Sequence, residues 1–121
     1  MRQIRNLLPL LLCLSSLALQ AAPSPKATAE IDALLNFVEH SDCRFIRNGS
    51  EYSGSKARAH LQQKLDYLEN KDLVNSAEDF IERAASKSSM SGKPYQVSCP
   101  GGKQEASTWL TTELKRLRQG Q

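Results

Sequence analysis

Apolar side chains recur every three or four residues in four segments of the chain, a spacing that predicts amphipathic helices. The first predicted helix begins at Ser24-Pro25, because serine favours the N-cap and proline is well tolerated in the first turn. Ser53 or Ser55 is expected to cap the second, and Asn75 with Glu78 resembles a capping box for the third. The first three helices are predicted to cover about residues 24–40, 53–71 and 75–87. The fourth follows Pro100-Gly101-Gly102, and its apolar side runs from Ala106 to Leu117.

The N-terminus carries a different hydrophobic pattern. Arg2 and Arg5 precede a mostly apolar run from Leu7 to Leu19, which is followed by the small residues Ala21 and Ala22. This order is typical of a secretory signal peptide. The run is shorter than the roughly 20 residues of a membrane-spanning helix, so no stable membrane insertion is expected after cleavage. Cleavage after Ala21 would divide the chain into a signal peptide, residues 1–21, and a single small α+β domain, residues 22–121.

The charge of the predicted mature domain limits its partners. The signal peptide holds two of the 16 Lys and Arg residues and none of the 13 Asp and Glu residues, so residues 22–121 carry a net charge of about +1. Nucleic-acid recognition usually needs a basic surface, so nucleic acid is not an expected partner. No cluster of potential ligands has the spacing of a metal site, and neither a metal nor a cofactor is expected.

Two short segments alternate between apolar and polar residues, as β-strands do, and each contains one cysteine of the mature domain. The first segment begins at Cys43 and ends before the turn signal Asn48-Gly49, and the second ends at Cys99. An even pair of cysteines in a small exported domain predicts a disulfide. Only antiparallel strands place Cys43 beside Cys99, because a parallel register would separate them by most of a strand length.

The antiparallel register fixes which other side chains face one another. Phe45 is predicted to lie opposite Val97, and Arg47 opposite Tyr95. The predicted fold class is therefore α+β and mostly helical, with about four helices packed on a short two-stranded antiparallel ribbon that one disulfide closes.

Polar residues gather around two turns that this register places at the same end of the ribbon. Serine hydroxyls, turn amides and an arginine are groups that bind anions. His60 and Lys64 belong to a partly basic stripe that borders the apolar face of the second helix. This stripe continues to Tyr67 and Lys71. The predicted ligand is a protein or a polar, anionic envelope component. The predicted binding surface comprises Arg47, Asn48, Tyr52, His60, Lys64, Ser89, Ser91, Gly92, Lys93 and Tyr95.

Two other functions fit the sequence. Ser53 or Ser91 with His60 as a general base would make a small serine hydrolase, and Ser53 and Lys56 have the spacing of the serine and lysine in penicillin-recognising enzymes. Serines at a helix start or in a turn more often serve as caps and turn residues, so no catalytic residue is assigned. The third function is that of a structural or stress-induced protein without a specific ligand.

Three segments of the mature chain carry a family resemblance: "FIRNG" at 45–49, "ARAHLQQKL" at 57–65 and "FIERAASKSSMSGKPYQV" at 80–97. Together with the signal peptide, they resemble the YfeK family of small exported bacterial proteins of unknown function. The resemblance implies a periplasmic location in a Gram-negative cell. It implies no activity, substrate or catalytic residue.

Overall fold

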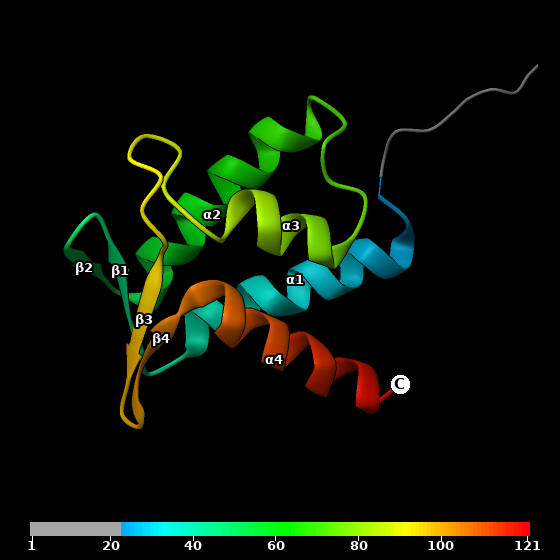
Figure 1. Ribbon diagram of the computed structural model, residues 1–121. Helices are drawn as coiled ribbons and strands as arrows, with labels where there is room; N and C mark the ends of the chain where they lie inside the picture. The colour runs from blue at the N-terminus through cyan, green and yellow to red at the C-terminus, as the bar shows by residue number, and fades with distance from the viewer. Residues whose placement is uncertain (1–22) are drawn as a thin grey trace, which may run out of the picture.

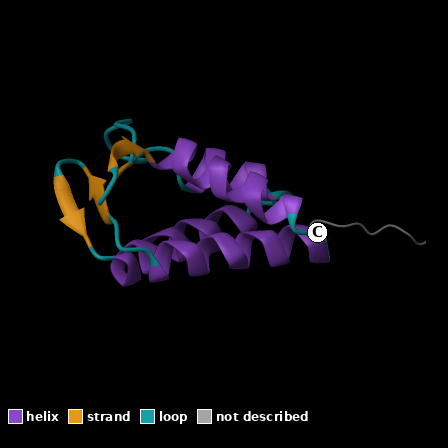
Figure 2. Cartoon of the chain, turned by 90° about the horizontal axis from the view of Figure 1, so that it is seen from below, coloured by secondary structure: helices purple, strands orange, loops and turns teal. Residues whose placement is uncertain are grey.

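The computed structural model describes residues 23–121, and the predicted signal peptide, residues 1–21, lies outside them. The strands gather at one end of the helices, and the C-terminus lies at the other end (Figures 1 and 2). None of the helices in residues 23–121 is long and apolar enough to cross a membrane. The elements in this range are α1 (Pro25–His40), β1 (Arg44–Arg47), β2 (Ser50–Tyr52), α2 (Gly54–Glu69), α3 (Ala77–Ala84), β3 (Gln96–Cys99), β4 (Gly102–Glu105) and α4 (Ala106–Gln119).

The starts of the first two helices agree with the sequence. Ser24 Oγ accepts a hydrogen bond from the Ala27 amide, and Ser53 Oγ accepts one from the Lys56 amide. The third helix begins one residue later than predicted, with Ser76 as its N-cap. It also ends at Ala84 rather than near residue 87, because the backbone there pairs with the returning chain: the Ser86 carbonyl accepts from the Tyr95 amide.

The sheet has four antiparallel strands in the order β2-β1-β3-β4, so the prediction of a two-stranded ribbon was wrong. Each predicted strand belongs to a hairpin with a second strand. Asn48 and Gly49 have φ angles of 51° and 81°, and two positive φ values make the tight turn that matches the twist of a hairpin. β2 and β4 lack alternating apolar residues, and all four residues of β4 are exposed. Hairpin geometry rather than hydrophobic pattern therefore forms both strands.

The predicted antiparallel pairing of the two central strands is confirmed, but the ladder ends at Ile46 opposite Gln96, so the predicted pair of Arg47 with Tyr95 is not part of it. β1 and β3 are antiparallel, with Phe45 opposite Val97. Cys43 and Cys99, just before β1 and at the end of β3, form a disulfide with their Cα atoms 4.2 Å apart. Phe45 and Val97 are both buried and belong to the hydrophobic core, so this face of the sheet packs against the helices.

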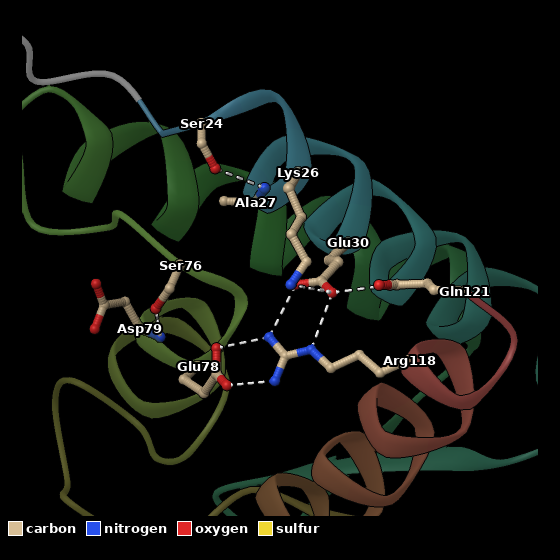
Figure 3. A network of polar contacts seen from close by, with 9 residues as sticks. All are labelled: Ser24, Lys26, Ala27, Glu30, Ser76, Glu78, Asp79, Arg118 and Gln121. Carbon is tan, nitrogen blue, oxygen red and sulfur yellow. Dashed lines mark hydrogen bonds and ion pairs between the residues drawn. The ribbon is translucent and has the colours of Figure 1, made fainter.

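A buried carboxylate joins three helices near the C-terminus (Figure 3). Glu30 in α1 is only 6% exposed, and its two carboxylate oxygens accept hydrogen bonds from Arg118 in α4 at 2.9 and 3.0 Å. Arg118 also donates to Glu78 in α3. The hydrogen bonds from Arg118, assisted by Gln121, hold the pKa of Glu30 at about 2, well below its usual 4.5. This network is structural, because its charges are paired with one another.

The network predicts a specific pH dependence of stability. A carboxyl whose pKa is lower in the folded than in the unfolded state contributes stability above the unfolded value, and this contribution is lost as the pH falls. For Glu30 the loss runs from about pH 4.5 to about pH 2. Glu30→Gln should therefore be less stable than the wild type at pH 7, with the difference shrinking towards pH 2. Urea denaturation from pH 7 to pH 2 measures the difference in unfolding free energy between the two proteins. Glu82→Gln, which changes an exposed carboxylate, is the control. A difference for Glu30→Gln that stays constant with pH would contradict the lowered pKa of Glu30.

Candidate functional site

A pocket of about 160 Å³ lies where the sheet meets α2 and the start of α4. We call it the cationic pocket. Its wall is mostly apolar, and none of its twelve lining residues is Asp or Glu. The lining residues are Phe45, Ile46, Arg47, Tyr52, Lys56, Ala57, His60, Leu61, Ala85, Tyr95, Ala106 and Leu110.

Helix α2 supplies basic residues to one side of the pocket. Lys56, His60 and Lys64 are spaced four residues apart, which places them along one face of the helix. Lys56 and His60 line the pocket itself, whereas Lys64 lies one turn further along. Ser53 is the N-cap of this helix, which begins directly after β2 and extends away from the sheet.

The first hairpin supplies the next cation. Arg47 ends β1, and the tight turn brings Tyr52 of β2 beside it. Arg47 Nη2 donates a hydrogen bond to the Tyr52 hydroxyl at 3.4 Å, and the guanidinium carbon lies 5.2 Å from the centre of the Tyr52 ring. A cation at this distance from an aromatic ring is attracted to it, so Tyr52 positions the guanidinium.

The Tyr95 hydroxyl connects the sheet to the basic face of α2. It lies 3.0 Å from His60 Nε2 and 3.1 Å from Lys64 Nζ, and Lys64 also donates to the Lys87 carbonyl. An ammonium group can only donate, and a phenol has a single proton. Lys64 therefore donates to the Tyr95 hydroxyl, and the direction of the bond between Tyr95 and His60 Nε2 depends on the His60 tautomer.

Burial and neighbouring charges shift three pKa values at the site. Burial lowers the pKa of His60, and the charges of Arg47 and Lys64 lower it further. The pKa of Lys64 is lowered by burial and then by Arg47. Burial raises the pKa of Tyr95, which Arg47 partly opposes. The surroundings of His60 therefore disfavour its protonated form, and the positive charges of Arg47 and Lys64 repel each other.

The cations at this site lack acidic partners. In residues 23–121, Arg47, Lys56 and Lys64 form no ion pair with a carboxylate, whereas Arg44 and Arg58 both do. Like charges that face a partly apolar space without counter-charges create a positive potential, which attracts an anion. The pocket thus has the chemistry of an anion-binding site with an apolar wall.

The predicted binding surface divides in the structure. Five of its members meet at or beside the cationic pocket: Arg47, Tyr52, His60, Lys64 and Tyr95. The other five lie around the turn at residues 88–93 or on the hairpin that contacts it. Ser89 lines a separate hollow beside Tyr67, and Asn48 and Lys93 line a third one.

The second group is held by bonds within itself. Asn48 donates to Ser88 Oγ and accepts from Ser91 Oγ, so the two turns do lie side by side. Ser91 Oγ also accepts from the Lys93 amide, and Gly92, with a φ of 75°, allows the turn. These hydroxyls and amides already have partners, which favours a structural role for the turn.

The serines of the hydrolase hypothesis have similar roles. Ser53 is the N-cap of α2, and Ser91 bonds to Asn48. In the part of the chain that the structure describes, His60 bonds to Tyr95 and to neither serine. Neither serine of the hydrolase hypothesis therefore has His60 as a hydrogen-bonded base in the described residues.

Sequence reasoning considered Lys56 only as a partner of Ser53 and left it out of the binding surface, and it missed the apolar wall of the pocket. Lys56 stands four residues before His60, so extending the basic face of the second helix by one turn would have found it. No comparable pattern in the sequence identified the residues of the wall. These residues come from β1, α2, α4 and the C-cap of α3, and the approach of these elements to one another is not encoded in any local pattern.

Comparison with known proteins places the chain in a family. A family model described as a family of unknown function (DUF5329) matches residues 25–118, and the chain belongs to this family. The uncharacterized protein YfeK of Salmonella typhimurium (strain LT2) is 41% identical over 68 residues, which cover 55% of this chain and 55% of that protein. No solved structure matches the chain. The predicted resemblance to the YfeK family is confirmed, and neither description assigns an activity.

Proposed function

We propose that this protein is exported to the periplasm as a non-enzymatic binding domain, and that it holds a polar, anionic envelope component in the cationic pocket. The observation that carries the proposal is a mostly apolar pocket with Arg47 and Lys56 in its lining and Lys64 one helical turn further along. These three cations form no ion pair in residues 23–121. Uncompensated charge costs folding stability, and an anionic ligand would offset that cost.

Binding is favoured over hydrolysis by the hydrogen bonds of the site. The Tyr95 hydroxyl engages both His60 and Lys64, so these side chains have fixed orientations before any ligand arrives. Such preorganisation lowers the entropy cost of association. The candidate nucleophiles Ser53 and Ser91 act as a helix cap and a turn residue.

The proposal predicts opposite effects of one double variant on binding and on stability. Arg47→Gln with Lys56→Gln should weaken binding of an anionic ligand at least tenfold, or about 1.4 kcal/mol. It should leave the melting temperature unchanged or raise it, because the repulsion around His60 is relieved. Calorimetric titration of the oxidised protein with muramyl dipeptide, glycerol phosphate and dihexanoylphosphatidylglycerol measures the binding.

The matched control is Lys103→Gln, which removes a cation from the same sheet but outside the pocket. It should retain wild-type affinity apart from a small general effect that salt removes. The proposal fails if none of the three anions binds the wild-type protein, or if the double variant binds them as tightly as Lys103→Gln does.

A further inference from the structure

We propose that the ligand of the cationic pocket is a free small organic anion, with one acidic head and an apolar group about the size of a benzene ring. This inference rests on the proposed function, because it names the chemical class of the ligand for the same pocket. Carboxylates and sulfonates of an aromatic ring or of a short branched chain belong to this class.

The size of the pocket sets the apolar part of the ligand. Its volume is about 160 Å³. An apolar cavity of about 150 Å³ in a protein stays dry when empty and binds benzene. A single ring or a chain of similar volume therefore fills this pocket, and a long acyl chain does not fit within it.

The wall of the pocket selects an apolar group rather than a sugar. Seven of the twelve lining residues are aliphatic or phenylalanine. Phe45, Leu61 and Leu110 among them are at most 7% exposed. A sugar placed against this wall would leave hydroxyl groups without hydrogen-bond partners, which costs free energy, whereas a ring gains from leaving water.

The polar side of the pocket matches a single acidic head. Arg47 uses an Nη2 proton on Tyr52 and keeps the other donors of its planar guanidinium, which can hold a carboxylate or sulfonate through two parallel bonds. Lys56 supplies a second cation, and His60 also lines the pocket. Lys64 already donates hydrogen bonds to Tyr95 and the Lys87 carbonyl. It therefore contributes to the positive electrostatic potential of the pocket rather than contacting the ligand directly.

Three probes separate the ring from the charge. Benzenesulfonate carries both and stays ionised across the accessible pH range, methanesulfonate carries the head alone, and benzyl alcohol carries the ring alone. Calorimetric titration of the oxidised protein should show benzenesulfonate binding at least tenfold tighter than either of the others. Equal affinity for methanesulfonate would overturn the inference, and so would equal affinity for benzyl alcohol.

Two variants test the placement of the ligand. Ala57→Leu adds volume to the wall, and its benzenesulfonate affinity should fall to the level of methanesulfonate. Lys56→Gln alters an exposed side chain and is not expected to affect folding. It should lower the affinity for benzenesulfonate several-fold and leave the affinity for benzyl alcohol unchanged. Unaltered benzenesulfonate binding in Lys56→Gln would overturn the placement, whether or not Ala57→Leu folds.

The failure of this inference is distinguishable from failure of the proposed function. If the envelope anions bind in a manner that depends on Arg47 and Lys56 while benzenesulfonate binds no better than methanesulfonate, the function stands and the ligand class is wrong. If benzenesulfonate binds in a manner that depends on Lys56 while none of the envelope anions binds, the envelope component is wrong, whereas anion binding by the pocket and the ligand class stand. If neither benzenesulfonate nor the envelope anions bind, both are wrong.

Discussion

Loss of the disulfide between Cys43 and Cys99 should lower the free energy of unfolding by about 4 kcal/mol, because the bond closes a loop between residues 56 positions apart. For a domain of this size, such a change corresponds to a fall in melting temperature of roughly 15–30 °C. The bond also joins the two central strands of the sheet, so its loss is expected to loosen the strand that carries Arg47.

Guanidinium denaturation at pH 7 of the wild-type protein and of Cys43→Ser with Cys99→Ser measures this effect. The double variant avoids a free thiol that could form bonds between molecules. The oxidised wild-type protein treated with iodoacetamide is the control, since it should contain no reactive thiol. A difference below about 1 kcal/mol would contradict the expected contribution of the bond.

Gly54→Ala should destabilise the protein by about 1–3 kcal/mol, the range typical of an overpacked position. Helix propensity alone would make this substitution stabilising, since alanine is favoured over glycine in helices by up to about 1 kcal/mol. Gly54 is buried in the first turn of α2, where a methyl group would lie 2.6 Å from the Val38 carbonyl oxygen and 2.7 Å from that of Glu39. Both are backbone atoms at the end of α1 and cannot rotate away.

The matched control is Gly101→Ala, because a methyl group at Gly101 would meet no atom within 4 Å. Melting curves of both variants should show a large fall for Gly54→Ala and little change for Gly101→Ala. Since Gly54 lets α2 approach α1, its substitution should also displace Lys56 and His60 and weaken anion binding. A neutral or stabilising Gly54→Ala would show that the close approach of the two helices is not required.

The helices and the central strand pair could be predicted because their signals are local or are fixed by one covalent bond. The Ser24-Pro25 start of α1 follows from preferences that act within a single turn. The pairing of Phe45 with Val97 followed from the requirement that Cys43 and Cys99 be adjacent. The end of α3 was less predictable, because the competing partner of Ser86 is the distant Tyr95 amide.

Part of the candidate site was also predictable. The register placed Arg47 and Tyr95 on one side of the ribbon, and helical periodicity placed His60 and Lys64 on one face of α2. The sequence did not show that Ser91 would bond to Asn48 rather than stand beside the basic residues. Ser91 and Asn48 are 43 positions apart, so no local pattern indicates that they bond to each other.

The sequence by itself determined the helical pattern, the disulfide and the register of β1 against β3, because periodicity, capping and one covalent link specify them. Only the tertiary structure decided the outer strands β2 and β4 and the pocket. Those strands lack a hydrophobic pattern and depend on backbone pairing, and the pocket depends on the contact of His60 with Tyr95, 35 residues away. No preference within one helical turn fixes a contact at that separation; the packing of the whole core does.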